Sequence, residues 1–161
     1  MSAAKIIELL DKLIKLHENL YKLSVQKTDV IKKSDMEGLD KFLKDEQKYV
    51  KAIEQVERER QHTVASLIGN QSQSTSLTDV VKYVSDEERG KLLGQRERLL
   101  QLVNQLKSQN QLNQQLIYNS LQYVNLTLDM LRPAPPADFN YKKPTNAAPK
   151  GINRGMFDSK A

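Results

Sequence analysis

Residues 85–133, SDEERGKLLGQRERLLQLVNQLKSQNQLNQQLIYNSLQYVNLTLDMLRP, decide the fold of this chain because they predict one long amphipathic helix. Ser85 and Glu88 stand three residues apart, which is the spacing of a capping box at a helix N-terminus. Pro133 ends the helix, because proline lacks an amide donor and clashes with the preceding turn. The helix therefore spans roughly residues 86–131 and is about 70 Å long.

Apolar and amide side chains recur along this helix in steps of three and four, which places them on one face. This first seam consists of Leu99, Val103, Leu106, Asn110, Asn113, Ile117, Leu121, Val124, Leu128 and Leu131. Asn110 and Asn113 have two interpretations. They specify the register of packing inside a bundle, or this part of the seam stays hydrated until a partner arrives.

A second apolar stripe lies beside the first seam. It consists of Leu112, Leu116, Tyr123, Leu126 and Met130. A helix that is apolar on two faces needs partners on two faces. These five residues are therefore the candidate cargo-binding site, a groove for an amphipathic helix of another protein.

Residues 99–128 contain a single charged side chain, Lys107, and nearly all their polar positions are Gln or Asn. One interpretation is compositional bias in a bundle helix. The other is a surface that meets another chain, because neutral amides are desolvated at lower cost than Lys or Glu.

Two earlier helices are predicted at residues 3–31 and 35–68, with a short helix at residues 77–84. The first has the apolar face Ile6, Leu9, Leu13, Leu16, Leu20, Leu23 and Val30, with Lys27 as the one charged residue in the seam. The second has Leu39, Leu43, Val50, Ile53, Val64 and Leu67. It begins at a capping box with Ser34 as the cap and ends at Gly69.

The helix order and the short first connection predict an all-α fold, an up-down-up antiparallel bundle of three long helices with a short connecting helix. We expect two regions, a coiled-coil-like bundle over residues 1–132 and a disordered tail over residues 133–161. The tail holds all five prolines, and it has five basic and two acidic side chains. It also holds the large side chains Phe139, Tyr141, Ile152, Met156 and Phe157.

Several function classes are disfavoured by the composition. There is no cysteine and no apolar run near the ~20 residues that span a bilayer, and the N-terminus lacks a signal-peptide core, so we expect a cytoplasmic protein without stable membrane insertion. The isolated His17 and His62, interpreted as solvated, predict no metal, no cofactor and no catalytic site. The charged residues 57–60 are interpreted as a solvated helix face.

Nucleic-acid binding is not expected, because the excess positive charge lies in the tail rather than in a basic stripe on the helices. The two hypotheses that remain are a binding module for other proteins and a self-associating coiled-coil structural or adaptor protein.

The long last helix with Asn110, Asn113 and Leu116, its ending at residues 128–133 and the tail after it resemble the FlgN-type flagellar export chaperones. Residues 155–161 look like the ending of Gram-positive members. The resemblance implies a cytosolic chaperone of flagellar type III export. Such a chaperone binds the C-terminal helices of hook-associated (hook-filament junction) proteins, keeps them unassembled and delivers them to the export gate.

The resemblance also implies how the parts of the chain are used. Cargo binds the end of the last helix and the tail, and a tyrosine beyond the helix end is linked to docking on the export gate. Tyr141 matches that tyrosine by its distance from Pro133. The protein alone is expected to be a monomer or weak dimer.

Overall fold

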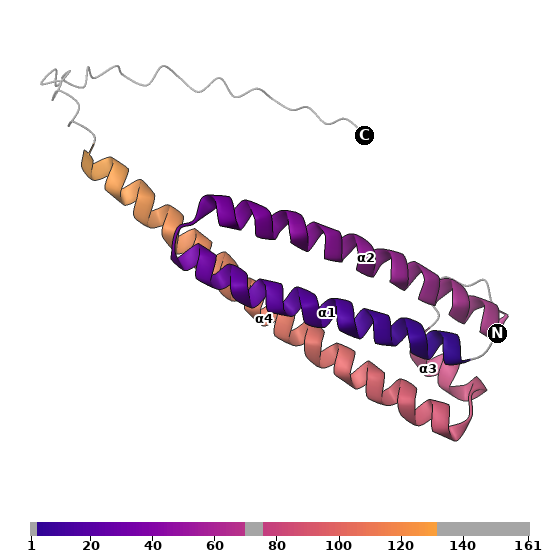
Figure 1. Ribbon diagram of the computed structural model, residues 1–161. Helices are drawn as coiled ribbons and strands as arrows, with labels where there is room; N and C mark the ends of the chain where they lie inside the picture. The colour runs from indigo at the N-terminus through magenta and orange to yellow at the C-terminus, as the bar shows by residue number, and fades with distance from the viewer. Residues whose placement is uncertain (1–2, 70–75, 132–161) are drawn as a thin grey trace, which may run out of the picture.

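The computed structural model describes residues 3–69 and 76–131, and within these ranges the chain is helical with no strand. The three long helices are α1 (Ala3–Lys32), α2 (Met36–Ile68) and α4 (Asp86–Leu131). A short α3 (Leu77–Val80) and a 3-10 turn (Val81–Tyr83) precede α4 (Figure 1). The predicted all-α class and the up-down-up order are therefore confirmed, and the short helix ends earlier than predicted because its last turn tightens.

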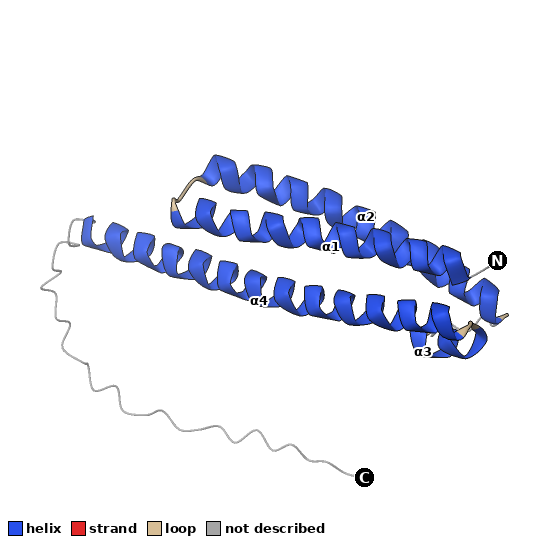
Figure 2. Ribbon diagram, turned by 60° about the horizontal axis from the view of Figure 1, so that its bottom comes forward, coloured by secondary structure: helices blue, strands red, loops and turns tan. Residues whose placement is uncertain are grey.

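The central helix of the bundle is α1. It packs against α2 along one side and against α4 along the other, whereas α2 and α4 scarcely touch each other (Figures 1 and 2). Because α2 and α4 do not pack closely against each other, the three helices form an open arrangement rather than a closed bundle. Over the described residues, no further helix covers the face of α1 that lies between α2 and α4.

The best-packed part of the core lies at the end of the bundle where α1 and α4 begin and α2 ends. Its buried side chains come from all three long helices and from α3: Ile6, Leu10, Leu13, Val64, Val80 and Leu92. Burial of an aliphatic side chain contributes about 1.5–3 kcal/mol of transfer free energy. This closed end is therefore the rigid base that positions α4.

The turn between α1 and α2 uses a different cap from the predicted one. Ser34 has a left-handed backbone with φ of 56°, and Asp35 is the N-cap, whose carboxylate accepts a hydrogen bond from the Gly38 amide at 2.9 Å. A Cβ on Gly38 would collide with that carboxylate, so glycine there lets the Asp35 side chain keep its capping position. The prediction of Ser34 as the cap was wrong, because an Asp one residue later supplies the same acceptor.

The other predicted ends are confirmed. Gly69 ends α2 in a left-handed conformation with φ of 69°, and its amide donates to the Ala65 carbonyl at 3.0 Å. At the start of α4, the Glu88 amide donates to the Ser85 hydroxyl at 3.4 Å and the Ser85 amide donates to the Glu88 carboxylate at 3.2 Å, which is a complete capping box.

Candidate functional site

The end of α4 extends past the turn that joins α1 and α2 (Figure 2). We call residues 121–131 the projecting end. Every large apolar side chain in it is at least half exposed: Leu121, Tyr123, Val124, Leu126, Leu128, Met130 and Leu131. A contiguous apolar surface of this kind marks an interaction site in a folded protein.

The structure places the five residues of the predicted cargo-binding stripe in three different surroundings. Leu116 and Tyr123 line one hollow beside the α1–α2 turn. Leu112 lies instead beside Tyr21 of α1, in a separate shallow pocket. Leu126 and Met130 lie on the projecting end, at 60% and 78% exposure. The last three residues of the stripe, Tyr123, Leu126 and Met130, share the projecting end.

The hollow beside the turn, which we call the turn hollow, has a volume of about 570 Å³. Its walls come from the end of α1, the start of α2 and residues 116–124 of α4, and they are largely apolar. The side chains that give it this character are Val30, Ile31, Met36, Leu39, Leu116, Ile117, Leu121, Tyr123 and Val124. The turn hollow runs directly into the projecting end, so the two form one continuous apolar surface.

A polar layer fixes α4 against α1 next to the turn hollow. Asn113 is 1% exposed, and its amide nitrogen donates to the Ser24 carbonyl at 2.9 Å while its oxygen accepts from the Thr28 hydroxyl at 2.5 Å. The Ser24 hydroxyl donates to Asn110 at 2.8 Å, and Gln109 donates to the Thr28 hydroxyl at 2.6 Å. Because Asn113 is buried with its hydrogen bonds satisfied by protein groups, the structure supports register specification over a hydrated seam.

On the other side of α1, Lys27 forms an ion pair with Glu46 of α2 at 2.7 Å. Their side chains are only 10% and 18% exposed. Lys27 is the one charged residue that the sequence places in the seam of the first helix. Its ammonium group lies largely out of water, because a carboxylate of the neighbouring helix lies within reach.

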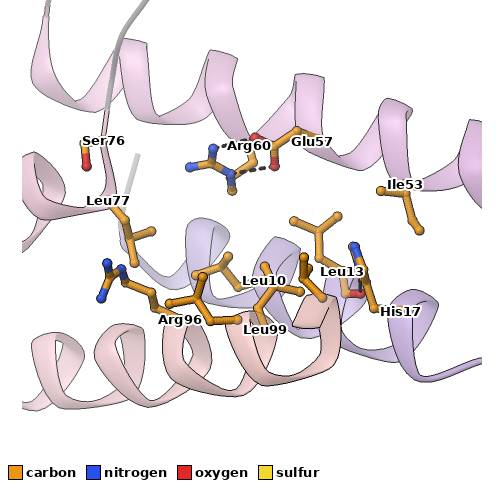
Figure 3. Close-up of a pocket in the computed structure, with 12 residues that line it drawn as sticks. Leu10, Leu13, His17, Ile53, Glu57, Arg60, Ser76, Leu77, Arg96 and Leu99 are labelled. Carbon is orange, nitrogen blue, oxygen red and sulfur yellow. Dashed lines mark hydrogen bonds and ion pairs between the residues drawn. The ribbon is translucent and has the colours of Figure 1, made fainter. Parts of the chain in front are cut away.

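A second hollow, at the closed end of the bundle, is lined by side chains from α1, α2 and α4 (Figure 3). Its volume is about 470 Å³, and its apolar walls include Leu10, Leu13, Ile53 and Leu99. We call it the closed-end hollow. Ion-pair and histidine side chains also reach it, so it is more polar in character than the turn hollow.

Glu57 and Arg60 form a two-pronged ion pair at the edge of the closed-end hollow, with N–O distances of 2.8 and 2.5 Å. Partial burial raises the pKa of Glu57, but the hydrogen bonds and charge of Arg60, with Gln61 and His17, outweigh it and hold the pKa below the usual 4.5. The interpretation of residues 57–60 as a fully solvated face was wrong for this pair, since the Arg60 side chain is 14% exposed.

The histidines have different surroundings. His62 is exposed, as predicted. His17 is half-buried, its Nδ1 lies 2.8 Å from the Leu13 carbonyl, and it lines the closed-end hollow. Over residues 3–69 and 76–131, no three His, Asp or Glu side chains gather in a metal-binding group. No helix within these ranges is long and apolar enough to cross a membrane.

Tyr141 and the rest of the predicted tail lie outside the described residues. The structure therefore gives no surroundings for the predicted export-gate docking residue.

Comparison with known proteins gives two matches. Residues 1–149 match the FlgN family, described as FlgN protein. The chain is also 38% identical over 162 residues to the uncharacterized protein YvyG of Bacillus subtilis (strain 168), and the match covers 100% of both chains. No solved structure matches the chain.

Proposed function

This chain belongs to the FlgN family, and on that premise we propose that it is a cytosolic type III export chaperone for hook-associated proteins. In this proposal it binds their C-terminal helical region, keeps them unassembled and delivers them to the export gate. The family supports a flagellar export chaperone role in general. We propose the particular cargo, the binding residues and the export-gate step from the features that follow.

The observation that carries the proposal is the apolar projecting end of α4 together with the turn hollow. Tyr123, Leu126 and Met130 are 60–78% exposed and follow one another along one face of the helix. A helix of this kind binds an amphipathic partner helix by removing apolar area from water, at about 25 cal/mol per Å². A cargo helix held there has its own apolar face covered, which prevents it from packing into an assembly.

We assign the later step, docking on the export gate, to residues 133–161 and in particular to Tyr141. A proline-rich segment has the reach to contact a second protein while the helix holds the first. In this division of labour the two regions of the chain, residues 1–132 and 133–161, act in sequence. Tyr141→Ala is expected to leave the cargo complex intact and to reduce export of the cargo.

The test of cargo binding is calorimetric titration of the full chain with the C-terminal fragments of the hook-associated proteins. Leu126→Asp should weaken binding by about tenfold or more, because the new carboxylate must be desolvated against the cargo. Asn125→Asp is the matched control, since it adds the same charge at an exposed position outside both apolar stripes. Equal binding by both variants would remove the projecting end from the site.

The alternative is a self-associating coiled-coil structural or adaptor protein, in which the projecting end meets a second copy of the chain. The mass of the free protein in solution separates the two. An export chaperone of this design is expected to be a monomer or weak dimer, whereas a stable oligomer that Leu126→Asp dissolves would favour the alternative.

A further inference from the structure

The side of the bundle between α2 and α4 is a second place, besides the projecting end, where apolar side chains lack a partner helix. Apolar side chains with seam spacing are exposed on both neighbours of α1: Leu43 and Val50 of α2 at 44%, and Val103 of α4, which lines the closed-end hollow, at 42%. The sequence predicted all three as seam residues. Their exposure follows from the separation of α2 and α4, which leaves α1 covered from two sides only.

The two hollows lie along the same rows of residues. On α1, steps of three and four lead from Leu13 in the closed-end hollow to Ile31 in the turn hollow, and on α2 they lead from Ile53 back to Leu39. On α4 the same steps lead from Leu99 to Ile117 and Val124. Both hollows thus have α1 as their floor and α2 and α4 as their walls, and we call the strip of surface between α2 and α4 that includes them the groove.

The middle of the groove is polar. The Lys27–Glu46 ion pair and the Ser24–Asn110 hydrogen bond lie on these rows, halfway between the two apolar hollows. These groups already bond to one another and are largely out of water, so the apolar side chains of an occupant are required chiefly at its two ends.

The closed end of the groove is also unbalanced in charge. Arg96 lines the closed-end hollow opposite Arg60 (Figure 3). Arg60 is paired with Glu57, whereas Arg96 has no ion-pair partner within residues 3–69 and 76–131. A carboxylate on the occupant near this end would complete that pairing.

We propose that the groove takes one amphipathic helix of a hook-associated protein, about 20 residues long, which completes a four-helix bundle with α1, α2 and α4. This rests on the proposed function and specifies the helix that it recognises. The helix has apolar side chains toward its two ends and an acidic residue beside Arg96.

The chain itself does not supply such a helix. Residues 133–161 contain five prolines spaced so that no proline-free run reaches 20 residues, and proline breaks a helix interior. The apolar part of α4 in a second copy, residues 99–128, contains no acidic side chain to pair with Arg96. A different protein fits the groove better than either.

The absence of cysteine from the sequence makes the test direct, since a single introduced thiol is the only one to react. Leu100→Cys and Val50→Cys place a thiol in the closed-end hollow and on the α2 wall, and Leu126→Cys places one on the projecting end. Gln55→Cys, on the opposite face of α2, is the control. Each full-length variant is treated with a maleimide, alone and with the C-terminal fragments of the hook-associated proteins.

With a bound fragment at about ten times its Kd, we expect the rate of modification to fall about tenfold at Leu100→Cys, Val50→Cys and Leu126→Cys and to stay unchanged at Gln55→Cys, since only free protein reacts. Protection of Leu126→Cys alone would overturn the groove and leave the proposed function standing. No binding by any fragment would overturn both. Two results without fragment would also overturn the groove as a site for another protein. Protection that rises with protein concentration would indicate self-association, and protection that is abolished by deletion of residues 133–161 would indicate that the tail occupies the groove.

The proposed pairing of Arg96 with an acidic residue of the fragment is tested separately. Arg96→Glu should weaken fragment binding by about tenfold, and changing one acidic residue of the fragment to Lys should restore it. Lys22→Glu, which makes the same charge change on the outer face of α1, should leave binding unchanged. Equal affinity for the Arg96→Glu and Lys22→Glu variants would remove the acidic residue from the description of the partner.

Discussion

Leu102 and Leu126 lie on the same helix, yet Leu102 is 2% exposed and Leu126 is 60% exposed. Most of α4 packs along α1 and contributes Leu92 to the core, whereas the end of α4 extends past the turn between α1 and α2 (Figure 2). The spacing of apolar residues is continuous through both parts. Periodicity therefore encodes which face of a helix is apolar, and the lengths of the neighbouring helices decide where that face is covered.

The largest difference between the packed core and the projecting end should appear when a large apolar side chain is truncated to alanine. Leu13→Ala is expected to lower the free energy of unfolding by about 2–5 kcal/mol, because it leaves a cavity in the closed end. Leu126→Ala should change it by no more than about 0.5 kcal/mol, because that side chain already meets water. Chemical denaturation measures both, and equal losses would mean that the projecting end is packed in solution.

The polar layer should show the next largest difference. Asn113→Ala removes two buried hydrogen bonds, to the Thr28 hydroxyl and to the Ser24 carbonyl, and at about 0.5–1.5 kcal/mol each this is expected to cost about 1–3 kcal/mol of unfolding free energy. Asn125→Ala on the projecting end is the matched control and should be neutral within about 0.5 kcal/mol. A neutral Asn113→Ala would indicate that water enters this layer, which is the interpretation that the structure disfavours.

The ion pair of Lys27 extends the comparison to α2. Glu46→Gln should lower the free energy of unfolding by about 1–2 kcal/mol, because it leaves an ammonium group largely out of water, although the pair is not fully buried. Asp45→Asn breaks an exposed pair with Lys48 and should cost less than about 0.5 kcal/mol. Recovery of stability in Lys27→Met combined with Glu46→Leu would identify desolvation as the cause.

The smallest effect is the pH dependence contributed by Glu57. Its pKa is lowered in the folded protein, so the unfolded chain binds the proton more readily, and the stabilisation is present above pH 4.5 and lost as the pH falls through the lowered pKa. Between about pH 5 and about pH 3 the original chain should therefore lose more stability than Glu57→Gln, by less than about 1 kcal/mol because the carboxylate is partly screened by solvent. Denaturation midpoints at several pH values measure the difference, and parallel curves would contradict it.

The ends of the helices could be predicted from the sequence because local chemistry sets them. Ser85 with Glu88 and Gly69 define helix ends without reference to the rest of the fold. The resemblance to the FlgN family rests on the ending of the last helix and on the tail, and not on any chemical motif.

What the sequence did not predict are features that depend on a second helix. The partner of Lys27 is 19 residues away on α2, and the burial of Asn113 depends on α1. The two hollows arise because α2 and α4 stand apart, which no periodicity within one helix reveals. The surroundings of the stripe from Leu112 to Met130 also depend on a second helix, because its start lies beside α1 and its end lies on the projecting end.

The central position of α1 has a consequence for how the protein is made. A chain is synthesised from its N-terminus at roughly 5–20 residues per second, so α1 leaves the ribosome first and can pair with α2 through the tight turn at Asp35 as soon as α2 follows. The hydrogen bonds that join α1 to α4 link residues 80–89 positions apart. The second face of α1 therefore stays without its partner helix for roughly 4–17 s of synthesis. During that time the nascent hairpin presents to the cell the same apolar surface that the finished protein keeps covered with α4.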